Sequence, residues 1–533
     1  MTNFSSITSE WAARFSSLIG DKPSDKAVAL AESVELLTPI EMAEADRQTI
    51  AAGTPGIALM EKAGIAVADA VRRIVPAGSQ VVVLAGPGNN GGDGIVAAQN
   101  LADSGYLVTV GLLGNRHALR GDAARAAEGW MGPLDSLTPA ILEGADVIVD
   151  ALFGAGLSHP VEGVAAETIM AANESGVPIV AVDLPSGVDG GTGEVLGTAV
   201  KARETVTFFR RKPGHLLQPG RCHAGRVTVV DIGIDASTLE AIAPRTFYNI
   251  PDLWLGSFPR LDVNAHKYKR GHTVVVSGPM TRTGAARLAA RGALRIGSGV
   301  VTVASPRDAL LVHASHLTAI MLLPMDGSVD LVDILADDRR NAVVLGPALG
   351  VGEMSAALVE AALGMMPAVV LDADALTSFS ENPDRLFEAI RGREAPTVIT
   401  PHEGEFARVF PDLAEVTSKL ARARAAAERS GAIVVLKGPD TVVADPEGRA
   451  SVTDVAPPFL ATAGSGDVLA GFIGGLLAQH MAPFEAASAA VWLHGAAAAA
   501  GGPGLISEDL PELLPAVMAD YIQLEAAPER DTK

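Results

Sequence analysis

Two glycine-rich turns, one in each half of the chain and each ending near an aspartate, constrain its fold most strongly. The first, residues 86–94, follows the apolar run 81–85, and the second, residues 463–467, opens the apolar stretch 468–477. A glycine-dense turn between a strand and a helix exposes backbone N–H groups at the helix N-terminus, where the helix dipole favours anions. Two such turns predict two nucleotide-handling sites on one polypeptide.

Length, composition and charge narrow the class of protein. A chain of 533 residues exceeds one ordinary hydrophobic core, so two large domains are expected. The composition, 48% hydrophobic and 19% charged, is typical of globular proteins. The net charge of −21 disfavours a nucleic-acid partner, because phosphate backbones bind basic surfaces.

Cysteine content and the N-terminal sequence favour a cytoplasmic location. The single cysteine, Cys222, cannot form an internal disulfide, and no Cys/His cluster has zinc-binding spacing. Residues 1–30 lack the pattern of a signal peptide. No run of about eighteen apolar residues predicts a membrane span.

Strand and helix patterns alternate along both halves. In the first half the predicted strands are residues 81–84, 107–113, 147–152, 179–184, 205–209 and 227–231. In the second half they are residues 273–277, 300–304, 342–345, 368–371, 397–400 and 433–436. Helical spacing lies between them, for example at 94–104, 163–174, 284–296 and 413–430. This alternation predicts an α/β fold with a doubly wound parallel sheet in the first half.

A proline-bearing segment separates the two series of elements. Residues 244–259 hold three prolines and few periodic apolar residues, which places the boundary near residues 240–262. We therefore expect an N-terminal extension at 1–30, a first domain at 31–245, a second at 246–525 and a charged tail at 526–533.

Three predicted strand ends in the first half carry side chains suited to one site. Asn90 and Asp93 lie on the first turn, Asp150 ends one strand, and Asp183 ends the next, followed by Ser186. Either aspartate alone could simply cap a helix or form a turn. Ligands of open α/β sheets bind beyond the carboxyl ends of the strands, so the combination favours a shared crevice.

With the opening motif at residues 36–42, these elements resemble the NAD(P)H-hydrate epimerase family over about residues 35–235. The resemblance implies a Rossmann-like fold that interconverts the two C6 epimers of hydrated nicotinamide cofactor. It implies a substrate-binding set of Asn89, Asn90, Gly91, Gly92, Asp93, Gly154, Ala155, Gly156, Leu157, Ser158, His159 and Pro160. It also implies a potassium site of Asn90, Asp150 and Ser186.

The resemblance further implies that Asp183 contacts the nicotinamide end of the substrate and is catalytic. Inverting C6 requires proton transfer and a stabilised cationic ring, both of which a carboxylate can supply. The segments 212–214 and 219–220 also match the family, whereas residues 1–30 lie outside its pattern.

Four motifs indicate phosphoryl chemistry in the second half. The turn at residues 464–467 offers amides for an anion, and Asp467 could accept a proton from an attacking hydroxyl, although such a turn could also merely cap a helix. Lys437 begins a basic turn after a strand, and His402 leaves another strand beside two acids. Asp372 and Asp374 follow a third strand, where one of them could orient metal or water.

From about residue 266 to the last helix, these motifs resemble a ribokinase-like fold, specifically the ADP-dependent NAD(P)H-hydrate dehydratase family. The resemblance implies contacts to the hydrated cofactor from Ala285, Gly350, His402 and Asp467, with Asp467 as the catalytic base. It implies contacts to ADP or AMP from Lys437, Gly438, Pro439, Asp440, Thr441 and Gly466. Magnesium is expected with the nucleotide phosphates.

Together the two resemblances imply repair of hydrated NADH and NADPH (NADHX and NADPHX). An epimerase would supply the S epimer to a dehydratase that consumes ADP and releases AMP and phosphate. A homo-oligomer is expected, since both families tend to associate.

Two alternatives stay open. One is a small-molecule kinase of the vitamin or sugar type fused to a non-catalytic nucleotide-binding module, which does not account for the His402 motif. The other is a first half that only senses a ligand. An ordinary dehydrogenase is disfavoured, because the first turn lacks the Gly-x-Gly-x-x-Gly arrangement with a distant acid.

Overall fold

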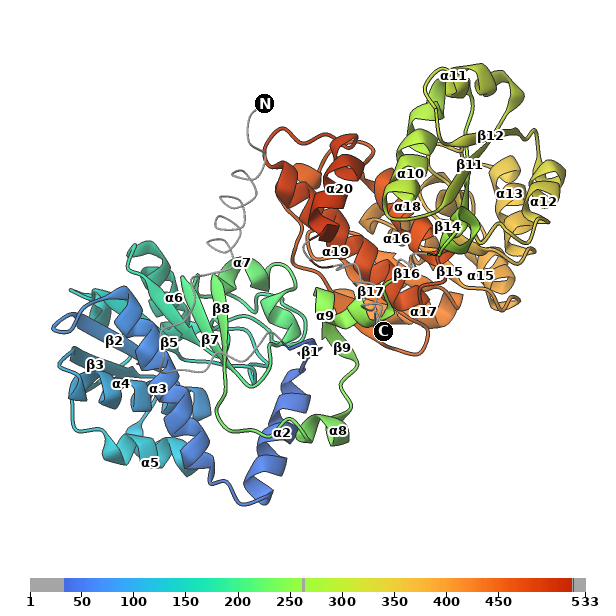
Figure 1. Ribbon diagram of the computed structural model, residues 1–533. Coiled ribbons are helices and arrows are strands. Elements are labelled where there is room, and N and C mark those ends of the chain that lie inside the picture. The colour runs from blue at the N-terminus through green and yellow to red at the C-terminus, as the bar shows by residue number, and fades with distance from the viewer. Residues whose placement is uncertain (1–32, 261–263, 520, 522–533) are drawn as a thin grey trace, which may run out of the picture. The chain divides into compact units, whose positions relative to one another are not determined.

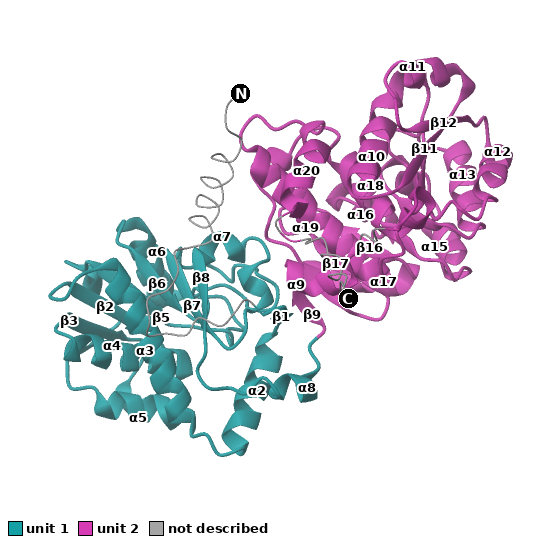
Figure 2. Ribbon diagram, viewed as in Figure 1, with its two compact units in different colours: residues 1–244 teal, residues 245–533 magenta. Residues whose placement is uncertain are grey.

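The computed structural model describes residues 33–260, 264–519 and 521, and the chain divides into two compact units (Figure 2). Unit 1 is residues 1–244 and unit 2 is residues 245–533. The division falls within the proline-bearing segment 240–262. The predicted extension at residues 1–30 and the predicted tail at 526–533 lie outside the described residues.

Unit 1 is built on a seven-stranded sheet in which every neighbouring pair is parallel (Figure 1). Its strands are β2 (Gln80–Ala85), β3 (Leu107–Leu112), β4 (Leu134–Ser136), β5 (Val147–Ala151), β6 (Ile179–Val182), β7 (Glu204–Phe208) and β8 (Arg226–Val230). They lie in the order β4-β3-β2-β5-β6-β7-β8. Apart from β4, each strand begins and ends within two residues of its predicted bounds.

Helices cover both faces of this sheet. They are α2 (Pro39–Ala51), α3 (Gly56–Ile74), α4 (Asn89–Asp103), α5 (Gly121–Gly129), α6 (Gly163–Glu174), α7 (Gly220–Ala224) and α8 (Thr238–Ile242). Successive residues of β2 enter different cores: Val81 and Val83 pack with α3 and α4, whereas Val82 and Leu84 pack with α6. A parallel sheet buried on both faces requires such continuously apolar strands, which confirms the predicted doubly wound fold.

The strand order of unit 1 reverses between β2 and β5. From β2 the chain moves outward to β3 and β4, then returns to β5 on the other side of β2. Loops leaving the carboxyl ends of β2 and β5 therefore diverge and leave a crevice between them. The turn at residues 86–94 follows β2, and the loop carrying Gly154 follows β5. The first turn of α4 begins at Asn89, so the helix starts earlier than predicted.

Unit 2 contains a mixed sheet. Its strands are β9 (Thr246–Tyr248), β10 (His272–Val276), β11 (Val300–Ser305), β12 (Met321–Pro324), β13 (Ala342–Leu345), β14 (Ala368–Leu371), β15 (Thr397–Ile399), β16 (Ile433–Leu436), β17 (Val442–Ala444) and β18 (Ala450–Val452). They lie in the order β12-β11-β10-β13-β14-β15-β16-β17-β18-β9. Neighbours from β12 to β16 are parallel, β17 is antiparallel to β16 and β18, and β18 and β9 are parallel.

The sequence patterns predicted β10, β11 and β13 to β16 of unit 2 and missed β9, β12, β17 and β18. The missed strands lie toward the two ends of the strand order. At three or four residues they match β13 to β16 in length, so their length alone does not explain why they were missed. The helices of unit 2 are α9 (Pro251–Trp254), α10 (Thr283–Arg295), α11 (Leu310–Ala314), α12 (Ser328–Leu335), α13 (Glu353–Leu363), α14 (Asp374–Thr377), α15 (Pro383–Arg391), α16 (Glu403–Val409), α17 (Lys419–Ser430), α18 (Ser465–Ala478), α19 (Pro483–Gly501) and α20 (Asp509–Ala519). Helix α17 begins later than the predicted residue 413, because Ser418 caps it by accepting a hydrogen bond from the Ala421 N–H.

Helix α18 is enclosed on all sides, because every residue from 468 to 478 is buried. It packs against α10 and against strands β13 and β14. A Cβ on Gly471 would lie 2.1 Å from the Ala289 carbonyl oxygen, and one on Gly474 would lie 2.4 Å from Val344. Only glycine permits these approaches, and they set the first turn of α18 at the carboxyl edge of the sheet.

Candidate active sites

The candidate site of unit 1 centres on Asp183, which follows β6. Lys212 donates from Nζ to Asp183 Oδ1 at 2.5 Å, and Thr207 donates from Oγ1 to the same oxygen at 2.9 Å. The Ala155 N–H donates to Asp183 Oδ2 at 3.2 Å. Burial acts to raise the pKa of Asp183, but the charge and hydrogen bond of Lys212 outweigh it and lower the pKa. Asp183 is therefore an anion held by a buried ammonium.

The backbone of Asp183 adopts an unusual conformation, with φ of 63° in the left-handed region. Its carbonyl oxygen lies 2.7 Å from His215 Nε2, and His215 Nδ1 accepts from the Lys212 N–H at 2.9 Å. The second contact makes Nε2 the protonated nitrogen, so Nε2–H donates to Asp183. Burial and the neighbouring Lys212 lower the pKa of His215 to about 3, which keeps the ring neutral. A neutral histidine thus fixes the strained residue.

Two further acids border this site without partners of their own. Within the described chain, neither Asp46 on α2 nor Asp93 on α4 makes a hydrogen bond or ion pair. Burial raises the pKa of Asp46 to about 6. Burial, with the charges of Asp183 and Asp46, raises the pKa of Asp93 well above its usual range. An ionised carboxylate and protonatable carboxyls therefore occur together, as acid–base chemistry at one centre requires.

The three residues predicted to hold potassium also lie at this crevice. Asp150 is fully buried and accepts from the Ser186 N–H at 2.8 Å and from Ser186 Oγ at 2.6 Å. Burial raises its pKa to about 6, because the hydrogen bonds from Ser186 only partly offset it. The side-chain nitrogen of Asn90 is buried and unpartnered, which leaves its amide free to turn its oxygen inward.

This donor set suits a hard cation. Asp150, Ser186, Asn90 and the Phe153 carbonyl, which lies 3.1 Å from Ser186 Oγ, offer oxygen atoms, the type of donor that hard cations prefer. No group of three His, Cys, Asp or Glu side chains suited to a metal occurs in the described residues. A cation here would also neutralise the buried carboxylate of Asp150. The residues present therefore fit the ion that the resemblance implies.

The loop after β5 is only partly brought to the site. A Cβ on Gly154 would lie 2.8 Å from Asn90 Oδ1 and 3.3 Å from Asp183 Oδ2, so Gly154 sits between the two side chains. Farther along the loop, Gly156, Ser158, His159 and Pro160 are exposed and Leu157 is half-buried. In the first turn, Gly91 and Gly92 are buried, and Asn89 is exposed at the start of α4.

Sequence reasoning missed Lys212, Thr207, His215 and Asp46. Lys212 and His215 lie in or beside the motif at 212–214, which matched the family without an assigned role. Nothing in the pattern of α2 distinguishes Asp46 from a solvated helix residue. Only the fold reveals these four residues, because it brings β7, α2 and the segment after β7 to the edge of the sheet where Asp183 lies.

The candidate site of unit 2 lies where β14, β15 and β16 end. Lys437 donates from Nζ to Asp372 Oδ1 at 2.7 Å, and Thr400 donates to the same oxygen at 2.8 Å. Glu405 Oε2 lies 3.9 Å from Lys437 Nζ. Although burial acts to lower the pKa of Lys437, the carboxylates of Asp372, Glu405 and Asp467 raise it, so the ammonium stays charged.

Asp467 occupies the first turn of α18, beside this cluster. A Cβ on its neighbour Gly466 would lie 3.4 Å from Lys437 Nζ and 3.8 Å from Asp372 Oδ2. Burial, together with the charge of Asp372, raises the pKa of Asp467 to about 7. Buried His494 donates from Nε2 to the Ser465 carbonyl at 2.9 Å, since a carbonyl oxygen can only accept. Burial lowers the pKa of His494 to about 4, so its ring is neutral near pH 7. The helix start thus carries a base that titrates near neutral pH.

His402 is the N-cap residue of α16. Its Nδ1 accepts from the Gly404 N–H at 2.9 Å, and its backbone N–H donates to Glu405 Oε2 at 2.9 Å. Nε2 faces Glu405 Oε1 at 3.3 Å, and about half of the His402 side chain is exposed. The capping box holds the ring at the carboxyl end of β15, beside Lys437, with which His402 forms a parallel bridge.

The remaining predicted cofactor contacts lie at neighbouring strand ends. Gly350 has φ of 97°, and its N–H donates to Asp374 Oδ2 at 2.8 Å. Ala285 is half-buried in the first turn of α10. Ala348, two residues before Gly350, adopts φ of 55°, a left-handed conformation that favours glycine.

The predicted nucleotide-binding turn is closed by its own contacts. Asp440 is buried and accepts from Lys419 Nζ at 2.7 Å. Thr441 Oγ1 donates to the Gly438 carbonyl at 2.9 Å and accepts from the Gly438 N–H at 3.1 Å. These side chains shape the turn, and Lys437 at its start faces the first turn of α18.

Asp372→Asn is expected to move the acidic limb of the pH–rate profile of unit 2 to lower pH. If Asp467 is the base, kcat/KM should fall about tenfold per pH unit below about 7, because only its carboxylate accepts a proton. Removing the neighbouring negative charge lowers the pKa of Asp467. Profiles of dehydration between about pH 5 and 9 measure the shift.

The matched control for that profile is Asp445→Asn, which removes another buried carboxylate of unit 2. Asp445 is paired with Arg449 at 2.6 Å. The Asp445→Asn variant should keep the acidic limb of the pH–rate profile at its native pH. If the acidic limb of folded Asp372→Asn were also unchanged, the charge of Asp372 would not raise the pKa of Asp467.

Two family profiles match the two units. The profile described as NAD(P)H-hydrate dehydratase matches residues 273–507, and the one described as YjeF-related protein N-terminus matches residues 56–214. A bifunctional NAD(P)H-hydrate repair enzyme of Salinibacter ruber is 36% identical over 526 residues, covering 91% of this chain and 96% of that protein. The chain belongs to the bifunctional NAD(P)H-hydrate repair enzymes.

Other bifunctional NAD(P)H-hydrate repair enzymes are similarly related. That of Gloeobacter violaceus is 38% identical over 478 residues, covering 87% of this chain and 92% of that protein. An ADP/ATP-dependent NAD(P)H-hydrate dehydratase from Bacillus subtilis, co-crystallised with ATP and Mg²⁺, is 29% identical, with a TM-score of 0.46. The match covers 51% of this chain and 98% of the Bacillus subtilis chain.

Membership in the bifunctional repair enzymes confirms the resemblance stated from the motifs and the expectation of an enzyme with an isomerase half and a lyase half. It weighs against both alternatives, the fused vitamin or sugar kinase and the ligand sensor. None of the helices in the described residues is long and apolar enough to cross a membrane.

Proposed function

We propose that the two crevices catalyse successive steps in the repair of hydrated NADH and NADPH. Unit 1 interconverts the R and S hydrates at C6, and unit 2 dehydrates the S hydrate at the expense of ADP. The observation that carries the proposal is the proximity of Asp467 and Lys437 at the first turn of α18, where each side chain shifts the pKa of the other.

Phosphoryl transfer begins the reaction in unit 2. Asp467 accepts the proton of the C6 hydroxyl, whose oxygen attacks the β-phosphorus of ADP, and AMP leaves with the electron pair of the broken P–O bond. Lys437 and the α18 amides stabilise the transferred phosphoryl group. The ring nitrogen then expels phosphate from C6, and loss of a proton from C5 restores the dihydronicotinamide.

The other assignments in unit 2 follow the motif positions. Ala285, Gly350 and His402 border the nicotinamide end of the hydrated cofactor. Lys437, Gly438, Pro439, Asp440, Thr441 and Gly466 border the adenine nucleotide. Asp440 acts through its backbone, because its carboxylate is paired with Lys419. Magnesium bound to the phosphates of the nucleotide would neutralise part of their charge.

Epimerisation in unit 1 uses the contrast between its carboxyls. A protonated carboxyl, that of Asp93, donates to the C6 hydroxyl, which leaves as water and produces a cationic ring. The Asp183 carboxylate stabilises that cation, and water adds to the opposite face with loss of a proton. Asn89–Asp93 and Gly154–Pro160 line the substrate. Asn90, Asp150 and Ser186 would hold a potassium ion, whose charge would offset that of the Asp150 carboxylate.

We also propose a cytoplasmic location and a homo-oligomeric state. The location rests on the single cysteine, and the oligomeric state rests on the tendency of both families to form homo-oligomers. Size-exclusion chromatography with light scattering tests the oligomeric state.

A recycling assay tests the function as a whole. Protein, hydrated NADH and ADP should regenerate absorbance at the reduced-nicotinamide band and release AMP and phosphate. Substrate enriched in the R epimer should react only as fast as unit 1 supplies the S epimer. Replacing potassium with choline should slow consumption of the R epimer and not of the S epimer. A stable phosphorylated product without NADH would instead favour a kinase.

A further inference from the structure

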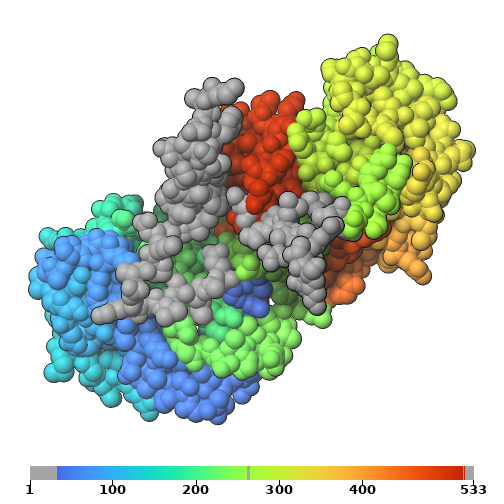
Figure 3. Space-filling model, in the orientation of Figure 1, coloured from blue at the N-terminus to red at the C-terminus, as the bar shows by residue number. Residues whose placement is uncertain are grey.

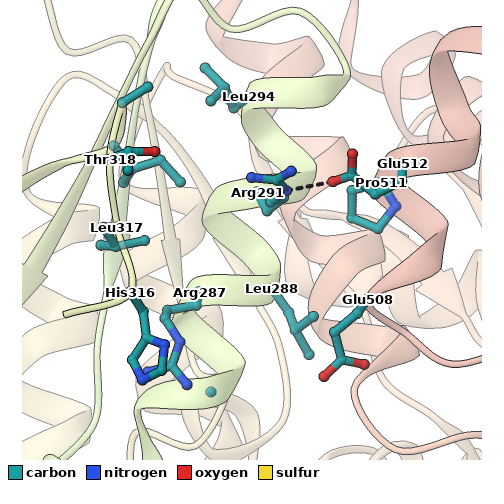
Figure 4. Close-up of a pocket in the computed structure, with 13 residues that line it drawn as sticks. Arg287, Leu288, Arg291, Leu294, His316, Leu317, Thr318, Glu508, Pro511 and Glu512 are labelled. Carbon is teal, nitrogen blue, oxygen red and sulfur yellow. Dashed lines mark hydrogen bonds and ion pairs between the residues drawn. The ribbon is translucent and has the colours of Figure 1, made fainter. Parts of the chain in front are cut away.

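A groove runs beside the candidate site of unit 2 and has no role in the chemistry above. It has a volume of about 430 Å³, within the range of small-molecule sites. One wall is α10 from Gly284 to Leu294, a rise of about 15 Å along the helix. The other walls are residues 316–320 and the start of α20 (Figure 4). In Figure 3 the red surface that includes α20 borders the yellow-green surface that includes α10.

The Gly284 end of this α10–α20 groove adjoins the turn that leads into Asp467. Gly284 precedes Ala285, a proposed contact of the nicotinamide end. Leu288, which lines the groove, packs against Gly464: a Cβ on Gly464 would lie 2.6 Å from Leu288 Cδ1. Ser507, beside the groove residue Glu508, lies 3.3 Å from the same point. The groove therefore borders the turn that leads into Asp467.

The groove carries one arginine that no acid neutralises. Arg287 donates to Thr283 Oγ1 at 2.8 Å and has no ion pair among the described residues. Farther along the helix, Arg291 binds Glu512 Oε1 at 2.5 Å, and Arg295 pairs with the same carboxylate. Since a guanidinium has five N–H donors, Arg287 retains most of its capacity for an anion. Arginine is the side chain best suited to phosphate oxygens.

The surroundings of Arg287 divide the groove into polar and apolar parts. His316 lines the groove on the same side, and both Arg287 and His316 lie close enough to buried His313 to influence its charge. Glu508 lies across from them on the α20 side (Figure 4). A carboxylate there could accept hydrogen bonds from sugar hydroxyls. Leu294, Leu317 and Ile320 supply apolar surface beyond these groups.

We propose that the α10–α20 groove binds the adenosine-diphosphate half of hydrated NADH and NADPH, with Arg287 on its phosphate oxygens. The inference rests on the dehydratase function proposed for unit 2. It extends that function, because the contacts assigned so far engage only the nicotinamide end. The second nucleotide, ADP, binds on the other side of the first turn of α18, beside Lys437.

ADP-ribose is the probe, because it contains the half expected in the groove and lacks the reacting ring. It should inhibit dehydration competitively against hydrated NADH at saturating ADP. Arg287→Gln should raise both the inhibition constant of ADP-ribose and the KM of hydrated NADH about tenfold or more, with kcat and the KM of ADP unchanged. Arg287→Lys should recover part of the loss, and Arg295→Gln, on the same helix outside the groove, should behave as the native enzyme.

Any of the following results would overturn the inference. ADP-ribose could fail to inhibit dehydration, or could compete with ADP and not with hydrated NADH. Arg287→Gln could bind ADP-ribose with native affinity. The variant could also lose kcat with an unchanged KM for hydrated NADH, which would indicate only a structural role of Arg287 through Thr283. Each of these leaves the native enzyme active. Failure of the proposed function looks different, because the native protein would then form no NADH from hydrated NADH and ADP.

Discussion

Asp467→Asn is expected to slow dehydration of the S hydrate by about 10²–10⁴-fold and to leave epimerisation unchanged. Asparagine keeps the size of the side chain but cannot accept the hydroxyl proton, while Lys437 and the α18 amides remain to bind phosphate. The rate is measured as absorbance of the reduced nicotinamide formed from S hydrate and ADP. Chromatographic separation of the two hydrates measures epimerisation in the same variant.

Asp326→Asn serves as the control for Asp467→Asn. It removes an exposed carboxylate of the same unit, which pairs with Arg307 at 2.6 Å, and should retain native dehydration. If a folded Asp467→Asn protein dehydrated the S hydrate at the native rate, the assignment of Asp467 as the base would be wrong, and so would the mechanism proposed for unit 2.

Asp183→Asn should produce the complementary defect, with epimerisation slowed by about 10²–10⁴-fold and dehydration of the S hydrate intact. The amide cannot stabilise a cationic ring as a carboxylate does. With a mixture of hydrates, the progress curve should stop at the fraction initially present as S. The plateau is read from the same absorbance assay, with excess ADP.

The design must allow for stability, because Asp183→Asn leaves the ammonium of Lys212 buried without its partner. Breaking a buried ion pair in this way costs about 3–5 kcal/mol. The double variant Asp183→Asn/Lys212→Met removes both charges and should recover much of the thermal stability without recovering epimerisation. If the double variant regained epimerisation as well as stability, Asp183 would be structural and not catalytic.

The sequence predicted the parts of both sites that lie at the ends of central strands of the two sheets. Apolar runs such as residues 342–345 and 368–371 have clear bounds, and parallel strands necessarily bring their carboxyl ends to one edge. The sequence positions of Asp150, Asp183 and Asp372, each at or just after the end of such a strand, therefore predict that they lie at the crevices. Glycine-rich turns identified Asn90 and Asp467 in the same way, because their conformational demands are local.

What the sequence could not predict depends on contacts between distant segments. Lys212, which comes after β7, meets Asp183, which follows the neighbouring strand β6. The role of Asp46 arises only from the placement of α2 against that site. In unit 2, the charge balance of Asp467 depends on Asp372 and Lys437, which come from two other strand ends. The α10–α20 groove depends on how two helices pack, for which no local pattern exists.

The enclosure of α18 restricts how this half of the protein can evolve. Gly471 and Gly474 leave no room for a larger side chain, and residues 468–478 of the helix are buried, so the end that carries Asp467 cannot be shifted without disrupting the core. Selection for new substrates would then act on the surrounding walls, such as the turn after β16 and the outer face of α10. The reaction would be inherited nearly unchanged, while the molecules admitted to it diversified.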